Sequence, residues 1–172
     1  MLSMTSLPSP TLADGYRYRL ECRVAPGDRA AVFVMLNPGT EREEDDDTGR
    51  HATRRRCMEF ARTWGCGRLI TVNLFAWRAR RPRLLAMASD PVGPENDSHI
   101  VAAAHEAAAS DGLLICAWGT HGCHRDRDRA VMRLLATTPA QPMALGTTAN
   151  GSPRHPLYVR ADRVPLPYCG RP

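Results

Sequence analysis

The sequence predicts a single α/β domain with three layers (αβα), in which helices cover both faces of a central, mostly parallel sheet of about four strands. Three observations indicate this fold class. Four apolar runs of strand length recur along the chain, and each stops at a polar residue or a turn. Segments with apolar residues at helical spacing separate these runs. Strands that alternate with helices in this way favour a parallel sheet with helices on both sides.

The length and composition fit one globular domain. The chain has 172 residues, of which 43% are hydrophobic and 24% are charged, and this is enough for a core of its own. Residues 1–14 are rich in Ser, Pro and Thr, so we expect a disordered N-terminal segment followed by a single domain over residues 15–172. The sequence contains neither an apolar stretch of bilayer-spanning length nor a secretory signal. We therefore expect a cytoplasmic monomer without a membrane partner.

The first half of the domain is predicted to contain an edge strand, two buried strands and one helix. Residues 16–24 alternate aromatic or apolar residues with arginine, which is typical of an edge strand with one wet face. Residues 30–36 are continuously apolar and predict a buried strand. Apolar residues recur at helical spacing over residues 54–64 and predict a helix, and residues 69–72 predict the next strand.

The second half continues the alternation. A turn-rich linker with good N-cap residues at its end precedes an alanine-rich helix over residues 97–109. Residues 113–117 predict a third buried strand, and residues 125–135 have the pattern of an amphipathic surface helix. A fourth short apolar run lies near residues 143–145. The last apolar run, residues 157–159, lies in a segment after Leu145 that is expected to be mostly loop or short strand.

Polar and aromatic side chains follow each predicted parallel strand. Asn37 comes directly after the first buried strand, and Asn73 ends the next one. Trp118 and His121 follow the third strand, and the loop after the fourth contains His155. In an open α/β sheet, ligands bind at the carboxyl ends of the strands. The sequence therefore predicts an active site in which these side chains meet along one edge of the sheet.

The types of basic residue in the chain indicate a possible partner and restrict the chemistry that the protein can perform. The formal net charge is +5, and every basic residue that contributes to it is arginine, because the sequence contains no lysine. Arginine stays charged and binds phosphate oxygens with two donors, which suits an anionic partner such as nucleic acid. Without lysine, no side chain can form a Schiff base with a carbonyl or sugar, so the expected nucleophile is water.

The six cysteines do not indicate a metal site. None of them forms a C-x-x-C pair, and their spacing to the histidines matches no standard zinc arrangement. Disulfides are rare in the cytosol, so we expect none here. We therefore predict that the protein uses neither a metal nor another cofactor.

Short motifs at the strand ends resemble a known superfamily. Residues 35–39 read Met-Leu-Asn-Pro-Gly, residues 116–119 read Cys-Ala-Trp-Gly, and residues 155–157 read His-Pro-Leu. In this order, with Asn73 between the first two, they resemble the uracil-DNA glycosylase superfamily. Its mismatch-specific branch has Gly-Ile-Asn-Pro-Gly, a later strand often ends Leu-Leu-Trp-Gly, and the last motif is His-Pro-Ser followed by Pro-Leu. The Ser of that motif is missing here, as is the aspartate of the Gly-Gln-Asp-Pro-Tyr branch. The resemblance implies a uracil-DNA glycosylase-like fold.

A larger part of the chain is closely similar to a family of bacterial proteins catalogued only as a domain of unknown function. The shared motifs are Leu36 to Pro38, Asn73 to Ala76, Asp90 to Gly93 with Asn96 and Asp97, Ala117 to Gly119, and Pro153 to Tyr158. This similarity brings no established function. It places the expected location in the bacterial cytosol or nucleoid.

The glycosylase resemblance implies an activity and a set of catalytic residues. The protein would be a monofunctional DNA glycosylase of base excision repair, which hydrolyses the N-glycosidic bond of uracil or a related deaminated base in DNA. Asn37 would hold the attacking water, and Asp46 or Asp47 from a dense acidic run would assist. His155 would donate a hydrogen bond to the O2 oxygen of the base as negative charge develops there.

The same resemblance implies residues that bind the base and the DNA. Asn73 would recognise the N3–H and O4 edge of uracil, and Phe75 would stack on the base, with Trp77 and Trp118 as alternatives. His121 is a weaker candidate for contact with the substrate. Further substrate-binding residues would be Leu36, Pro38 and Gly39. Arg78, Arg80, Arg81 and Arg154 would bind phosphates, and Leu157 and Tyr158 would wedge into the base stack.

Other interpretations remain open at the level of sequence. Asn37 can be a turn residue, Asn73 a buried residue that satisfies backbone groups, and His155 a surface residue of a Pro-rich loop. The chain can be a nucleic-acid-binding module on the same fold that lacks catalysis. It can also be an enzyme that hydrolyses or transfers the base of a free nucleoside or nucleotide, which would need the pocket but not the arginines.

Overall fold

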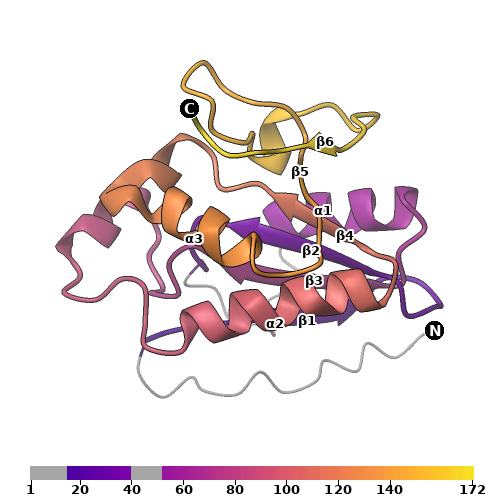
Figure 1. Cartoon of the computed structure of the whole chain (residues 1–172), viewed down its shortest axis with the longest axis horizontal. Coiled ribbons are helices and arrows are strands. Elements are labelled where there is room, and N and C mark those ends of the chain that lie inside the picture. The colour runs from indigo at the N-terminus through magenta and orange to yellow at the C-terminus, as the bar shows by residue number, and fades with distance from the viewer. Residues whose placement is uncertain (1–14, 40–51) are drawn as a thin grey trace.

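The computed structural model describes residues 15–39 and 52–172, and these residues form a six-stranded mixed sheet with helices on both faces (Figure 1). The strand order is β1-β3-β2-β4-β5-β6. The predicted disordered segment 1–14 lies outside the described residues. Asp46 and Asp47 also lie outside them.

The four central strands are parallel, as the sequence predicts. They are β2 (Ala30–Met35), β3 (Arg68–Asn73), β4 (Leu113–Cys116) and β5 (Pro142–Ala144). β2 pairs with both β3 and β4, and β4 pairs with β5, all in parallel. The runs of apolar residues in β2 and β4 are therefore explained by burial of both faces of the sheet.

Two antiparallel strands extend this core, so the sheet has more strands than the predicted number of about four. β1 (Leu20–Arg23) pairs antiparallel with β3 and is the expected edge strand. β6 (Leu166–Pro167) pairs antiparallel with β5 at the opposite edge. The sequence predicts loop or short strand after Leu145 but does not place β6, because two exposed residues are too few to show a periodic pattern.

The helices divide between the two faces of the sheet. α1 (Ala52–Thr63) buries Cys57 and Phe60 in a cluster with Phe33 of β2. α2 (Asn96–Ala109) and α3 (Arg127–Leu135) cover the other face, where Ile100 packs in the same cluster as Val34. Successive side chains of a strand point to opposite faces, so β2 supplies both layers. No α-helix in the described ranges combines the length and apolar character needed to cross a bilayer.

Within the described residues, three short 3-10 helices connect these elements: η1 (Pro82–Met87), η2 (Thr120–Asp126) and η3 (Pro156–Tyr158). The amphipathic helix predicted from residue 125 starts only at Arg127. Arg125 and Asp126 have φ angles of 53° and 52°, in the left-handed region, and an α-helix cannot pass through such residues. The pattern of apolar residues did not reveal this interruption.

The strand order creates a reversal point. The chain leaves β2 for its neighbour β3 and then crosses back over β2 to form β4 on the other side. The connections that follow β2 and β4 therefore diverge, and a crevice opens outside the carboxyl ends of these strands. In open α/β sheets this is the place where ligands bind.

Candidate active site

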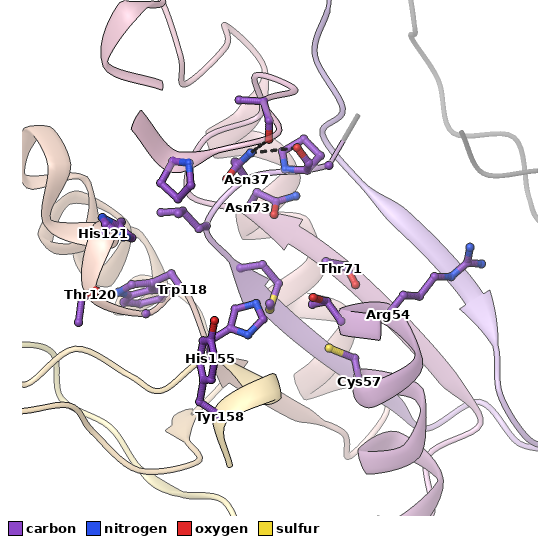
Figure 2. A pocket seen from close by; sticks show the side chains of 18 of the residues that line it. Asn37, Arg54, Cys57, Thr71, Asn73, Trp118, Thr120, His121, His155 and Tyr158 are labelled. Carbon is purple, nitrogen blue, oxygen red and sulfur yellow. Dashed lines mark hydrogen bonds between the residues drawn. The ribbon is translucent and has the colours of Figure 1, made fainter. Parts of the chain in front are cut away.

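A cavity of about 860 Å³ lies at the carboxyl ends of the parallel strands (Figure 2). Most of the predicted site residues line it, although they come from distant parts of the chain. They are Leu36, Asn37, Pro38, Gly39, Asn73, Arg80, Trp118, His121, Arg154, His155 and Tyr158. The structure thus brings together Asn37, Asn73 and His155, on which the predicted chemistry depends.

The cavity crosses the sheet along its strand order. Leu20 of β1 and Thr71 of β3 are partners in the sheet register, and both line the cavity. Met35 of β2 and Asn73 of β3 form the next pair of lining residues in register. Trp118 follows β4 on the far side. Because β1 is antiparallel, its N-terminal end lies at the same edge as the carboxyl ends of the other strands.

Asn37 is held by both hydrogen atoms of its side-chain amide. Nδ2 donates to the carbonyl oxygens of Pro38 (3.0 Å) and Ala79 (2.8 Å). Carbonyl oxygens can only accept, so these bonds fix which end of the amide faces them. Oδ1 is the remaining functional atom, and it is an acceptor. This arrangement suits a residue that accepts a hydrogen bond from water or substrate.

The side-chain amide of Asn73, unlike that of Asn37, is not held by hydrogen bonds to the described residues. Its residue is only 4% exposed, and its side-chain amide forms no hydrogen bond with any described residue. Buried polar side chains in proteins nearly always have a partner. In Figure 2 the amide lies near that of Asn37 at the edge of the cavity. Asn73 therefore presents both a donor and an acceptor to whatever occupies the cavity.

The backbone of Asn73 is held from α2 and α3. Nδ2 of Asn96 donates to the carbonyl oxygens of Asn73 (2.9 Å) and Leu74 (3.0 Å). The oxygen of Leu74 also accepts from Nε of Arg127 at 2.8 Å, and Arg127 forms an ion pair with Asp97. The sequence interpretation treated Asn96 and Asp97 as helix caps. Their side chains instead tie the end of β3 to the helices, and the Asn-Asp motif after Asp90–Gly93 was the signal for this role.

His155 is a neutral hydrogen-bond donor in the cavity. Its Nδ1 accepts a hydrogen bond from the backbone N–H of Leu157 at 3.2 Å. The proton of the neutral ring is therefore on Nε2. Burial lowers the pKa of His155 below its usual value of 6.5, because it disfavours the charged form. The ring of Tyr158 lies beside the imidazole, with centroids 5.7 Å apart.

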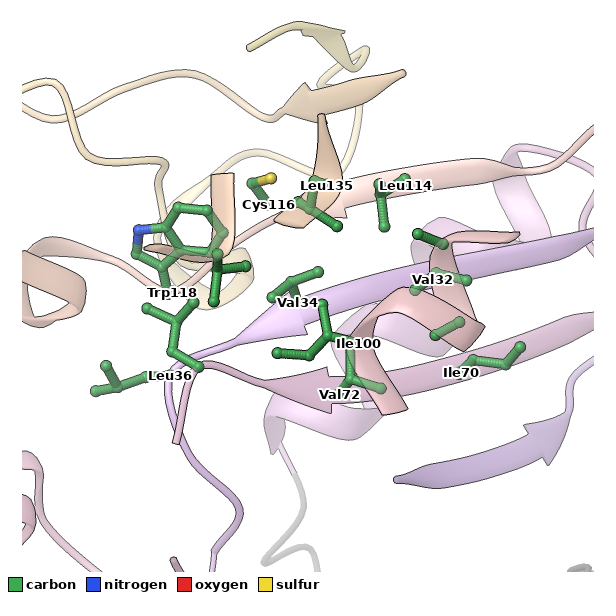
Figure 3. Packing of buried hydrophobic residues seen from close by; sticks show 14 of the residues in the cluster. Val32, Val34, Leu36, Ile70, Val72, Ile100, Leu114, Cys116, Trp118 and Leu135 are labelled. Atoms are coloured by element: carbon green, nitrogen blue, oxygen red, sulfur yellow. The ribbon is translucent and has the colours of Figure 1, made fainter. Parts of the chain in front are cut away.

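Trp118 forms a wall of the cavity rather than an open stacking surface. Its residue is 2% exposed, and the indole belongs to the same buried cluster as Val34 and Cys116 (Figure 3). Gly122 packs directly on this ring: a β-carbon there would come within 2.1 Å of Cδ1. Tyr158 is 77% exposed and also lines the cavity, so it has much more ring surface available.

Several predicted contacts lie outside the cavity lining. Phe75 is fully buried and packs against His124 in the core, so the prediction that it stacks on a ligand is wrong for this structure. The chain turns after Asn73, so Phe75 packs in the buried cluster on the face of the sheet that α2 and α3 cover. Trp77 packs edge-on against Tyr16, at 5.4 Å.

The other predicted residues outside the lining are Arg78, Arg81 and Leu157. Nε of Arg78 donates to the carbonyl oxygen of Gly39 at 3.4 Å. Gly39 lines the cavity, so Arg78 lies next to a lining residue. Arg81 is exposed, and Leu157 is 43% exposed beside His155. None of these three is among the residues that line the cavity.

Sequence reasoning missed a group of lining residues from β1 and the segment before it, from β3 and from α1. They are Arg17, Leu20, Thr53, Arg54, Cys57 and Thr71. Nothing in the local pattern of these segments distinguishes them from ordinary strand and helix residues. The described lining residues include four arginines and no Asp or Glu.

Comparison with known proteins identifies a family. The search of curated proteins and the search of solved structures gave no significant match. A family model described as "Protein of unknown function (DUF1643)" matches residues 17–157. Apart from Tyr158, this range contains all of the motifs shared with the uncharacterised bacterial proteins and all of the described cavity lining. The chain therefore belongs to the DUF1643 family.

Proposed function

We propose that this protein hydrolyses the N-glycosidic bond of uracil, or of a related deaminated base, in DNA. The observation that carries the proposal is that Asn37, Asn73 and His155 line one cavity. They supply an acceptor, an unpartnered amide and a neutral donor. These are the groups that cleavage of a base from its sugar requires, and no metal or other cofactor is needed.

His155 acts on the leaving group. As the glycosidic bond breaks, negative charge develops on the departing base, including its O2 oxygen. Nε2–H of the neutral imidazole donates to that oxygen, in a position fixed by the bond from Leu157 to Nδ1. A fixed donor in a site that excludes water stabilises developing charge strongly, and losing one donor of this kind costs about 100- to 1,000-fold in rate.

Asn37 positions the attacking water. Its Nδ2 is occupied by Pro38 and Ala79, so Oδ1 accepts a hydrogen bond from the water. An amide is a poor base, so the reaction depends on departure of the base more than on activation of the water. Asp46 or Asp47 assists this step in the proposal, from the segment between Gly39 and α1.

Asn73 recognises the base. Uracil presents N3–H as a donor and O4 as an acceptor, and a carboxamide can pair with both at once. The missing protein partners of this amide fit that role. The bonds from Asn96 to the carbonyls of Asn73 and Leu74 hold it in place.

The DNA is held around the cavity mouth. A base inside a duplex must leave the stack to reach such a site. Arg80 and Arg154 line the cavity, and Arg78 and Arg81 extend the positive surface around it. Tyr158 and Leu157 are exposed beside His155, where they can fill the space that the flipped base leaves.

The first experiment measures uracil release from an oligonucleotide. The full chain is incubated with a uracil-containing strand, and alkali then cleaves any abasic site. We expect His155→Ala and Asn37→Ala each to lower the cleavage rate about 100-fold or more. The matched control is His105→Ala, an exposed histidine on α2, which keeps the wild-type rate. Full cleavage by both site variants, or none by the wild type, would refute the proposal.

A free nucleotide is a second candidate substrate. The cavity volume falls in the range of sites that enclose small molecules, and Arg78 and Arg81 do not line it. An enzyme for free nucleotides would release uracil from a mononucleotide with little effect of salt. A DNA glycosylase would prefer the polymer and lose affinity as salt rises.

A further inference from the structure

The cavity has a second end, away from the residues proposed to act on the base. It lies over β1 and β3, where Leu20 and Thr71 face each other in the register. Arg17 lines it from the segment before β1, and Arg54 from the first turn of α1. In Figure 2 the Arg54 side chain extends past Thr71, away from His155. Two guanidinium groups thus border one end of the cavity.

The backbone around Arg17 is firmly attached to the sheet. Its N–H donates to the oxygen of Ala76 at 2.9 Å, and the oxygen of Gly15 accepts from the N–H of Arg78 at 3.0 Å. The neighbouring Tyr16 packs edge-on against Trp77. Arg17 is therefore part of a fixed wall, although it precedes β1.

Arg54 lies in the first turn of α1, so the N-terminal end of this helix also borders the cavity. Thr53 and Cys57, from the same part of α1, also line the cavity. The N–H groups of a first helical turn have no partner within the helix, and the helix dipole is positive there, so this end favours an anion. A guanidinium has five N–H donors, so each arginine can bind a phosphate oxygen and keep other contacts.

The end of the cavity over β1 and the end near β4 lie several inter-strand spacings apart. From β1 to β4 there are three inter-strand spacings, or roughly 14 Å across the sheet. The volume of about 860 Å³ is much larger than one base can fill. A base held by Asn73 and His155 would leave room for its sugar and a phosphate toward Arg17 and Arg54. The unpartnered amide of Asn73, in the same cavity, independently indicates that a ligand binds here.

We propose that Arg17, Arg54 and the first turn of α1 form a phosphate subsite within this cavity. The substrate is then recognised as a nucleotide, with its base, sugar and phosphate enclosed together, and a nucleoside is a poor ligand. This inference rests on the proposed function for the base end of the cavity. The phosphate belongs either to a DNA strand or to a free nucleotide, because both present the same charged oxygens.

The test measures binding rather than cleavage. Isothermal titration compares 2′-fluoro-deoxyuridine, its 5′-monophosphate and a short oligonucleotide containing the same residue; the fluorine makes the glycosidic bond resistant to hydrolysis. We expect a phosphate-bearing ligand to bind at least about tenfold more tightly than the nucleoside. Arg54→Met and Arg17→Met each remove most of that difference and leave nucleoside binding unchanged. Arg54→Lys keeps the charge without the two-donor geometry and retains part of it.

The control and the outcomes separate this inference from the proposed function. Arg133→Met, at an exposed position on α3, keeps the full preference for phosphate. A preference that only the oligonucleotide shows assigns the subsite to a DNA phosphate, and one that the monophosphate shows includes the free nucleotide. Equal affinity for all three ligands, or a preference that survives both arginine substitutions, overturns the subsite. Uracil release is scored separately, so either idea can fail while the other stands.

Discussion

His155 faces the cavity as a neutral donor because its other ring nitrogen already accepts the N–H of Leu157. Protonation would put two N–H groups opposite each other, and burial independently lowers the pKa of the ring. Between its folded pKa and the ordinary value of 6.5, the unfolded chain binds a proton at this position that the folded chain does not. The free energy of unfolding must therefore fall as the pH drops through this window.

Substitution of His155 should remove that dependence. We expect His155→Gln to flatten the plot of unfolding free energy against pH below 6.5, relative to the wild type. Urea unfolding from about pH 5 to about pH 8 measures it. His105→Gln, at an exposed position, should leave the slope as it is. A steeper decline in the His155 variant would show that the sign of the pKa shift is wrong.

Asn73 allows a test of base recognition at a single atom. Asn73→Asp replaces the donor Nδ2 with an acceptor, which repels O4 of uracil but can accept from the N4 amino group of cytosine. We expect the ratio of uracil to cytosine cleavage to fall by tenfold or more, about 1.4 kcal/mol. Asn73→Ala removes both contacts and should lower cleavage of uracil without raising that of cytosine. Unchanged selectivity in the aspartate variant would exclude a direct role for Asn73.

At the level of elements, the end of β3 depends on α2 and α3 for its position. Asn96 is fully buried and gives both of its amide hydrogens to carbonyl oxygens at this strand end. Leu74 keeps the bond from Arg127 if Asn96 is removed, but the oxygen of Asn73 loses its side-chain donor. An unsatisfied buried carbonyl costs about 1–3 kcal/mol.

This gives a prediction for Asn96→Ala. We expect the free energy of unfolding to fall by about 1–3 kcal/mol, and the preference of the site for uracil to weaken because Asn73 is no longer held. Ser98→Ala is the matched control, since Ser98 lies in the same turn and its hydroxyl donates only to the exposed Glu95. Its effect should stay within about 0.5 kcal/mol. A loss of stability with unaltered selectivity would make Asn96 a purely structural residue.

Across the whole molecule, the parallel core and the meeting of the strand ends were predictable from sequence. Buried parallel strands are uniformly apolar, and the rule that their carboxyl ends share an edge needs no knowledge of side-chain packing. The direction of Phe75 was not predictable, because it depends on how the chain turns after Asn73. The contribution of Arg17 and Arg54 was hidden for the same reason: their place in the cavity follows from strand order and from β1 being antiparallel.

The arginines around the cavity mouth make DNA binding sensitive to salt at the scale of the whole surface. Each phosphate contact releases condensed counterions, so the slope of log K against log salt changes by about 0.9 per contact. Arg80 and Arg154 both line the cavity, on segments far apart in the chain. The double variant Arg80→Met with Arg154→Met should therefore bind a uracil-containing oligonucleotide with a slope reduced by about two.

Fluorescence anisotropy of a labelled oligonucleotide, from about 50 to about 200 mM salt, gives these slopes directly. Arg133→Met, on the exposed side of α3, should match the wild type. The reduction must appear with uracil-containing and uracil-free strands alike, because phosphate contacts carry no base information. Parallel lines for wild type and double variant would mean that neither arginine touches the DNA backbone, and the polymer would then have to be held by another surface.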